Sequence, residues 1–352
     1  MSTVIQLNAP HRIPPREMRL SSLLALFAQG RRGGDDVFWL KENAELLNVL
    51  ECTGQSVPPE ALSVHEAFYR EAAERLRFFP QYYRFFLSMV LDIEDLGMGG
   101  ETGARMVAFA ERQGLPGAEL SDLQRAEARR LMRRRGVDPI REPGLDDRLR
   151  AFASRNATFA LPNKKAAYEL THIVFYLTEY GRKAADLPPE AIRSLHFAGL
   201  TAFLEQNADL LAEICIALDW AGDAAPLLWA DWLEEQTASF ALTCASDVSV
   251  ADDYHEFLVC NWHAAVTGRP VFRKPIAAER TRFDRAPRMA PLSEISRAMM
   301  TMDAGRSGDW SVMRDRMQPS LSPATCDLME AAARSSTHFD AFFEGFARAG
   351  QP

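Results

Sequence analysis

Four polar side chains recur at helical spacing within an apolar stretch that runs from position 168 to 181. Because they are three, four and three positions apart, a helix would place them on one face. They are Glu169, His172, Tyr176 and Glu179. An imidazole, a phenol and two carboxylates in line are groups that general acid–base catalysis uses. The same set can instead form a buried network, in which His172 is a core histidine hydrogen-bonded to Glu169 or Tyr176.

Two later segments also carry polar side chains within apolar helical sequence. Asp209 and Glu213 are four positions apart and therefore share a helix face. His255 follows Asp252 by three positions, so that this carboxylate could hold the tautomer of the imidazole. If these faces meet the face of His172, two imidazoles and a carboxylate form a set that suits Zn²⁺ or non-haem Fe²⁺.

The residues predicted to do chemistry thus fall into two groups. The predicted metal ligands are His172, Asp209, Glu213 and His255. Tyr176 and Glu179 are the predicted proton donor and acceptor, and a metal-free site would use His172 with Glu179. The alternative for Asp209 and Glu213 is a solvated stripe on a surface helix. The site hypothesis requires that the side chains of His172 and His255 approach each other in one cavity.

Composition limits the kinds of partner that the chain can bind. The 352 residues are 47% hydrophobic and 25% charged, as in globular proteins of one or two domains. A net charge of −8 argues against a nucleic-acid or acidic-membrane partner, because phosphate binding relies on accumulated positive charge. No apolar run reaches the length of a membrane span, and the first residues lack an apolar signal segment. We therefore expect a cytoplasmic protein.

The elements that must position these residues are helical. Every strong apolar segment has a period near 3.6, and no segment shows strand alternation between hairpin turns. The predicted class is all-α. We expect one continuous domain with an N-terminal helical part at 1–137 and a central helical part at 145–265 that carries the candidate site. A basic loop and the C-terminal helices follow at 266–352.

An order of features recurs in two segments. Leu-Glu-Cys-Thr-Gly at 50–54 precedes Pro-Pro-Glu-Ala at 58–61, and Leu-Thr-Glu-Tyr-Gly at 177–181 precedes Pro-Pro-Glu-Ala at 188–191. Each pair leads into a long helical stretch. The order predicts antiparallel helix hairpins stacked as an (α/α) toroid or an α-solenoid. Coincidence is the alternative, because Pro-Pro-Glu commonly opens a helix.

Two strongly charged segments have an ordinary interpretation. The acidic segment 92–95 ends one predicted helix, and an arginine-rich segment at 125–135 forms another. We interpret both as solvated helix surfaces.

A resemblance extends over roughly residues 165–265. The sequence Thr-His-Ile-Val-Phe-Tyr-Leu-Thr-Glu-Tyr-Gly at 171–181 resembles a Thr-His-x-x-Phe-Tyr-x-Thr-Asp-Phe-Gly pattern of uncharacterised all-helical bacterial proteins. The later segment 209–213 and the pair Tyr254-His255 also fit that pattern, whereas Glu179 and Tyr180 depart mildly from it. The pattern is similar to the helical toroids of terpenoid cyclases and prenyltransferases, some of which carry a central zinc. The zinc and acidic motifs of those enzymes are absent here, so the resemblance implies a fold and no activity.

Two functional hypotheses follow from these patterns. The first is a cytoplasmic enzyme, with or without a metal ion, that acts on a small or peptidic substrate in a helical cavity. It would work through His172, His255, Asp209 and Glu213. The second is a non-catalytic helical scaffold that binds another protein and uses the same residues as a buried structural network.

Overall fold

The structure is a computed structural model that describes residues 13–287 and 289–348. Prolines at 10, 14 and 15 predict an irregular arm over residues 1–17; its first twelve residues lie outside this part, and α1 already begins at Arg16. The described residues form helices α1 to α17 and one antiparallel two-stranded sheet. The all-α prediction is therefore confirmed. Whether the hairpins form a toroid or a solenoid stays a prediction.

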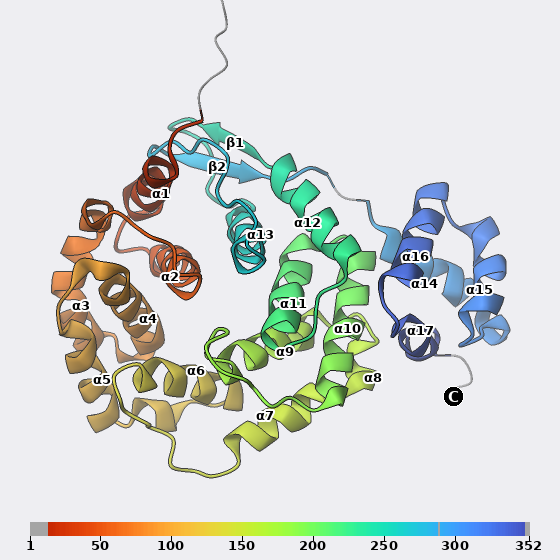
Figure 1. Cartoon of the computed structure of the whole chain (residues 1–352), viewed down its shortest axis with the longest axis horizontal. Helices are drawn as coiled ribbons and strands as arrows, with labels where there is room; N and C mark the ends of the chain where they lie inside the picture. The colour runs from red at the N-terminus through yellow and green to blue at the C-terminus, as the bar shows by residue number, and fades with distance from the viewer. Residues whose placement is uncertain (1–12, 288, 349–352) are drawn as a thin grey trace, which may run out of the picture.

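Helices in the first three quarters of the chain alternate between an inner and an outer position (Figure 1). The inner helices are α2 (Val37–Cys52), α4 (Tyr83–Ile93), α6 (Asp122–Arg133), α9 (Lys164–Leu177), α11 (Ala208–Trp220) and α13 (Tyr254–Val266). The outer helices are α1 (Arg16–Ala25), α3 (Glu66–Phe78), α5 (Thr102–Arg112), α7 (Leu145–Ala153), α10 (Pro189–Leu204) and α12 (Leu227–Ser239), with the short α8 (Asn156–Phe159) beside α10.

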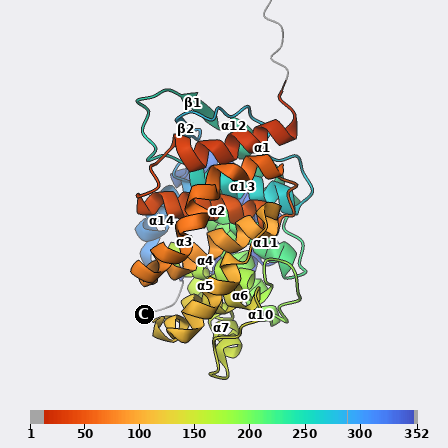
Figure 2. The ribbon, with the colours of Figure 1, turned by 90° about the vertical axis from the view of Figure 1, so that its left-hand side faces the viewer.

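Each inner helix contacts the next one, and the last contacts the first. The contacts run from α2 through α4, α6, α9 and α11 to α13, and α13 returns to α2. Figure 2 shows the helices on one side of this circle as nearly parallel rows from α1 down to α7. Apolar sequence explains the burial, because a helix that is apolar all round must be covered on every side. In α11, for example, residues 210–218 are all buried.

Shorter turns complete the helical chain. They are 3₁₀ or π turns at Leu26–Gly30, Pro59–His65, Pro80–Tyr82, Glu94–Met98, Leu115–Ala118, Asp303–Gly305 and Gln318–Ser320.

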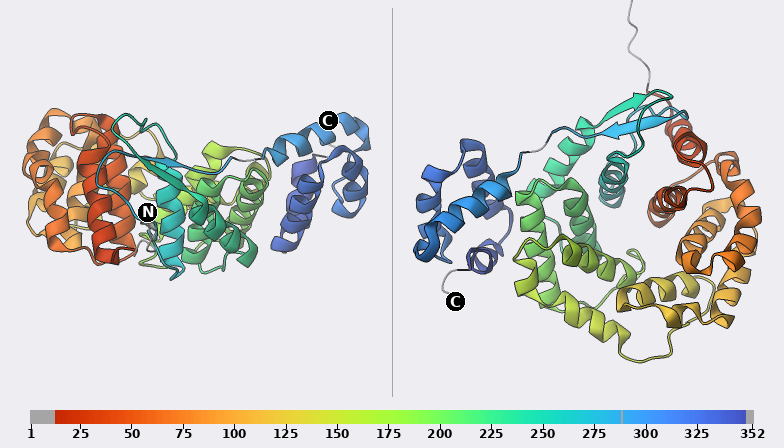
Figure 3. Two further views of the ribbon diagram at one scale, coloured as in Figure 1. Left: turned by 90° about the horizontal axis from the view of Figure 1, so that it is seen from above. Right: turned by 180° about the vertical axis from the view of Figure 1, so that it is seen from behind.

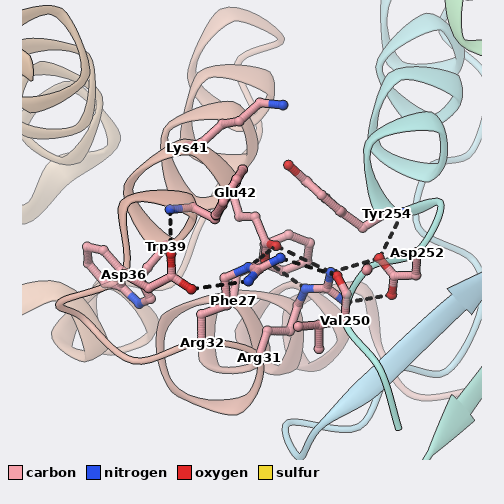
Figure 4. Close-up of polar contacts among 12 residues, drawn as sticks. Phe27, Arg31, Arg32, Asp36, Trp39, Lys41, Glu42, Val250, Asp252 and Tyr254 are labelled. Carbon is pink, nitrogen blue, oxygen red and sulfur yellow. Dashed lines mark hydrogen bonds and ion pairs between the residues drawn. The ribbon is translucent and has the colours of Figure 1, made fainter.

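The circle closes around one buried arginine (Figure 4). Arg31 is 1% exposed and follows the first outer helix. Its guanidinium binds Glu42 of α2 and Asp252 at the start of α13, each at 2.8 Å. It also donates to the carbonyl of Thr281 at 2.8 Å and lies 4.9 Å from the ring centroid of Tyr254. The N-terminal and central segments are thereby joined by one cation.

A small sheet lies beside this closure. Strand β1 (Ala241–Cys244) pairs antiparallel with β2 (Thr281–Asp284). The sequence predicts a helix over 225–242 and an irregular loop over 266–291, and both predictions were wrong where these strands form. Four-residue strands are too short to show the alternation by which a strand is recognised.

The C-terminal helices lie beside the circle (Figure 3). Both α16 and α17 pack on α10, and α16 also contacts α12. The sequence predicts a single helix over 323–349, but the structure has two, because the extended backbone of Ser336 separates them. The helices are α14 (Pro291–Met302), α15 (Trp310–Met317), α16 (Pro323–Ser335) and α17 (Phe339–Ala347).

The two Pro-Pro-Glu segments occupy equivalent places in the chain path. The first opens the 3₁₀ turn at Pro59–His65 before α3, and the second opens α10 itself, so that each follows an inner helix and begins the path into an outer helix. This is the arrangement that stacked hairpins require, while a true duplication stays a prediction.

The two charged segments bind each other, so their interpretation as solvated surfaces was wrong. Asp92 at the end of α4 is fully buried and accepts from Arg134 at 2.6 Å. Arg134 also binds Asp95, and Arg135 binds Glu94 at 2.7 Å. Pairing compensates for the cost of burying these charges. It was hidden in the sequence because the partners come from different helices.

Candidate functional site

Six ionisable side chains from four inner helices meet in one group joined by hydrogen bonds and close ion-pair contacts, which we call the inner-helix cluster. Its members are Glu45 of α2, Tyr168 and His172 of α9, Asp209 and Glu213 of α11, and His255 of α13.

Asp209 is the centre of this cluster. Asn207 caps α11 by accepting from the amide of Leu210 at 3.3 Å, which places Asp209 in the first helical turn. There the helix dipole favours a negative charge. Asp209 accepts from the hydroxyl of Tyr168 at 2.5 Å and from Nδ1 of His255 at 2.8 Å. Burial opposes ionisation, but the His255 charge and these hydrogen bonds hold the pKa of Asp209 below its usual value.

His255 is held as a cation by carboxylates on two sides. Its Nε2 lies 3.6 Å from Glu45, which also accepts from the hydroxyl of Tyr254 at 2.9 Å. Figure 4 shows the side chain of Tyr254 extending from α13 toward α2. Burial lowers the pKa of His255, but the charges of Asp209 and Glu45 outweigh it and raise the pKa to about 10. His255 therefore carries a positive charge at neutral pH, although a third of its side chain is exposed.

His172 has one engaged and one open ring nitrogen. Nδ1 lies 2.7 Å from the backbone carbonyl of Tyr168, and a carbonyl can only accept, so Nδ1 carries the hydrogen. In the neutral ring Nε2 is then a bare lone pair, and it has no hydrogen-bond partner in the described part of the chain. The side chain of His172 is 36% exposed, so solvent reaches the ring that carries this nitrogen.

Glu213 lies one helical turn after Asp209 and next to His172. Its carboxylate is 3.9 Å from Nδ1 of His172 and accepts from the hydroxyl of Thr171 at 2.6 Å. Burial raises the pKa of Glu213, because a charged carboxylate loses its hydration there. The two α11 carboxylates therefore differ: Asp209 is stabilised as an anion, whereas Glu213 takes up a proton more readily than an exposed glutamate.

The structure thus brings together the three helix faces that carry the predicted ligands. His172 and His255 contact carboxylates that are four positions apart on α11. The described residues contain no group of three His, Cys, Asp or Glu that could hold a metal ion. The four predicted ligands meet as two histidine–carboxylate pairs, and Tyr168 and Thr171 already occupy the carboxylates. Metal binding stays a prediction without geometric support.

Asp252 and Glu169 precede His255 and His172 by three positions each, but neither fixes the tautomer of its histidine. Asp252 binds Arg31 at the ring closure, and His255 is oriented by Asp209 instead. Nδ1 of His172 is engaged by a backbone carbonyl rather than by Glu169, which is half-buried at the same helix. Sequence spacing along a single helix could not reveal partners that come from neighbouring helices.

Glu179 is not on the helix face that its spacing predicted. Helix α9 ends at Leu177, and Glu179 lies in the following turn with a φ of +49°. Its carboxylate binds Lys183 at 2.8 Å. The next two residues, Tyr180 and Gly181, also have positive φ. Such backbone is strained for residues other than glycine. The prediction of one straight face from 169 to 179 was therefore wrong at its end.

This strained turn directs Tyr180 into a group of aromatic rings. Tyr180 stacks on Trp262 with ring centroids 5.8 Å apart and lies 5.7 Å from Trp220. Phe175 contacts all three rings. The guanidinium of Arg130 lies 4.1 Å from the centroid of Tyr180. These aromatic rings form an apolar wall at the far end of the same inner helices.

Tyr176 lies between this aromatic wall and the cluster. Its ring is 5.9 Å from that of His172 and 6.2 Å from that of Tyr180. Burial raises the pKa of Tyr176 well above that of an exposed phenol, so its hydroxyl stays protonated. In the described part of the chain this hydroxyl has no hydrogen-bond partner. It is therefore free to donate to a bound molecule.

Sequence reasoning missed two members of the inner-helix cluster, Tyr168 and Glu45, and the hydroxyl of Thr171 that binds Glu213. Tyr168 precedes His172 by four positions, a spacing that could have assigned it to the same face. Thr171 carried no such signal. Glu45 is 210 positions from His255, and no local pattern connects them.

Within the described residues, no helix is both long and apolar enough to cross a membrane. No curated protein and no solved structure matches the chain. One family profile matches residues 1–349, which is nearly the whole length. The chain therefore belongs to the protein family described as Domain of unknown function (DUF6902).

Proposed function

We propose that this protein is an enzyme that transfers protons to and from a small or peptidic substrate bound at the inner-helix cluster, within an (α/α) toroid. One observation carries the proposal. His172 donates its Nδ1 hydrogen to a backbone carbonyl and keeps an open Nε2 on a side chain that solvent reaches. A histidine whose tautomer is set in this way is ready to act as a general base.

The neighbouring groups supply complementary roles. The protonated hydroxyl of Tyr176, next to the His172 ring, serves as the proton donor. His255, kept cationic by Asp209 and Glu45, partly compensates the charge of these two carboxylates and so limits the negative charge beside the substrate. Its hydrogen bond to Asp209 fixes the ring orientation before the substrate binds. Groups with opposed protonation preferences in one place are the arrangement that acid–base catalysis requires.

The surroundings of the cluster support a substrate with an apolar part. The aromatic wall begins beside Tyr176 at Tyr180, in the turn after α9, and continues to Trp220 of α11 and Trp262 of α13. Ligand sites are mostly apolar and contain a few well-placed polar groups. The closed circle of contacts from α2 to α13 supports the toroid, in which inner helices would surround such a site.

His172→Gln tests the assigned base. We expect turnover in a panel of small esters, amides, carbonyl compounds and short peptides, followed by mass spectrometry. His172→Gln should lower any such turnover by about 10²–10⁴-fold, the usual contribution of a general base. Diethyl pyrocarbonate, which attacks neutral imidazole, should modify His172 in the wild-type chain. The melting temperature should fall only modestly, because Nε2 has no protein partner and the one bond lost joins Nδ1 of a partly exposed side chain to a carbonyl of its own helix.

His338→Gln is the matched control. His338 is a half-buried histidine before α17, outside the cluster, and its loss should leave turnover unchanged. Wild-type turnover that persists in His172→Gln would contradict the assigned base. If no compound reacts and His172 resists modification, the enzyme proposal fails in favour of the helical scaffold.

A further inference from the structure

A pocket separate from the inner-helix cluster lies between α12, α13 and the segment 269–275. Its volume is about 360 Å³, within the range of small-molecule sites. Phe257 and Ala264 of α13 form part of an apolar wall, together with Pro270 and Pro275. None of these residues belongs to the inner-helix cluster, so the pocket would serve another ligand.

A buried histidine in the pocket wall lacks a partner. His263 is 2% exposed, and its Nε2 has no hydrogen bond in the described part of the chain. Burial, aided by the charge of Arg269, lowers the pKa of His263 to about 4, so the ring is neutral at pH 7. Buried polar atoms are nearly always hydrogen-bonded, and the exceptions call for an explanation. A polar group of a bound molecule would satisfy Nε2.

Two cations of the same pocket also lack carboxylate partners. Arg273 is exposed and Lys274 is partly exposed, and neither forms an ion pair with another described residue. Arg269, by contrast, is bound by Asp231 at 3.2 Å and by Glu234 at 2.8 Å. The wall therefore carries two uncompensated positive charges in a chain whose net charge is −8.

The segment that carries these cations is held firmly. Phe272 is buried and has a φ of +46°, an uncommon conformation for a bulky residue. Its amide donates to Asn261 at 2.6 Å, and its carbonyl accepts from Arg19 at 2.8 Å. Asn261 is itself fixed by a bond to the carbonyl of Phe257 at 2.8 Å. Ordering the segment before binding removes part of the entropy cost of binding.

We propose that this pocket binds a small organic anion, an apolar carboxylate that carries a hydroxyl group. Its carboxylate pairs with Arg273 and Lys274, its apolar body contacts Phe257, and its hydroxyl bonds to Nε2 of His263. A hydroxyl suits a neutral imidazole because it can donate or accept, whichever tautomer is present. The inference does not depend on the proposed enzyme function.

Isothermal titration with three matched probes tests the proposal: 10-hydroxydecanoate, decanoate and 1-decanol. The hydroxy acid should bind most tightly, decanoate more weakly, and the alcohol not measurably. Arg273→Gln with Lys274→Gln should weaken binding of both acids at least tenfold. His263→Phe should remove the advantage of the hydroxy acid over decanoate and leave decanoate binding in place.

Lys165→Gln with Arg193→Gln is the control, since it removes the same charge from exposed side chains of α9 and α10 that do not line this pocket. It should leave all three affinities unchanged. The proposal is overturned if neither acid binds at millimolar concentration, if the alcohol binds as well as the acids, or if the control variant loses as much affinity. Should His263→Phe fail to fold, the exposed pair Arg273 and Lys274 still decides the outcome.

Discussion

At the scale of single residues, the two carboxylates of α11 show how environment separates chemically similar groups. Asp209 lies in the first turn of its helix and faces a cationic imidazole, which lowers its pKa. Glu213, one turn later, is buried beside Thr171 and has a raised pKa. The two histidines also differ in their surroundings. His255 has an ion-pair partner at 2.8 Å, whereas Nε2 of His172 has no partner among the described residues.

The pairing of His255 with Asp209 predicts a pH dependence. The folded pKa of about 10 exceeds the unfolded value of about 6.5. The pair therefore stabilises the fold fully below about pH 6.5 and loses this contribution as the pH rises toward 10. Asp209→Asn should lower the pKa of His255 and weaken this loss of stability. NMR titration of the histidine ring protons and urea unfolding at several pH values measure both effects.

Asp223→Asn is the control for that experiment. Asp223 binds His196 at 2.7 Å, outside the cluster, so its loss should leave the titration of His255 unchanged. A His255 resonance that titrates near pH 6.5 in the wild-type chain would contradict the proposed cation.

At the scale of elements, the turn after α9 has an unusual backbone conformation, with positive φ at three consecutive residues. Ending a helix requires only one such residue. Three consecutive residues with positive φ direct Tyr180 back into the aromatic wall. Gly181 completes this turn with a φ of +79°, and a Cβ at this position would lie 2.5 Å from Nε1 of Trp220. The glycine is thus required both by backbone conformation and by the close approach of an indole.

Gly181→Ala should therefore destabilise the protein more than an ordinary change at a positive φ. Gly54 offers a matched comparison, because it ends the equivalent turn after α2 with a φ of +61°, and a Cβ added there would meet no atom within 4 Å. We expect a loss of about 1 kcal/mol for Gly54→Ala and of at least ~2 kcal/mol for Gly181→Ala. Urea unfolding measures both losses of stability. Equal losses would show that the Trp220 side chain moves aside with no cost in free energy.

At the scale of the whole molecule, the closing contacts hold segments that are more than 200 positions apart. Arg31 is buried between Glu42 and Asp252, and three aromatic rings surround its guanidinium. Asp252 shortly precedes α13, which carries both His255 of the cluster and His263 of the second pocket. The position of α13 thus depends on this closure.

Arg31→Leu should destabilise the chain by about 3–5 kcal/mol, because two carboxylates would stay buried without their cation. The exposed pair of Arg133 with Asp138 supplies the control, and Arg133→Leu should cost less than about 1 kcal/mol. Chemical denaturation measures the free energy of unfolding of each variant. A loss for Arg31→Leu as small as that of the control would mean that the closure contributes little to stability.

The sequence by itself determined the helical class and most helix positions. Apolar periodicity, proline openers and glycine stops act within a few turns, so the beginnings of helices such as α2 at 37 and α9 at 164 could be recognised locally. The spacing of Asp209 and Glu213 likewise placed both carboxylates on one face. His172 and His255 were recognised as candidates because polar groups are rare in such apolar helices.

Only the tertiary structure decided which of these groups meet. Glu45 and His255 share one cluster across 210 positions, and the acidic end of α4 pairs with the arginines at the end of α6. The turn at 178–181 carries Glu179 away from the helix face, and Asp252 is bound by Arg31 rather than by His255. Periodicity reports which face of a helix is buried. The neighbour against which that face packs depends on the whole chain path, which no local pattern encodes.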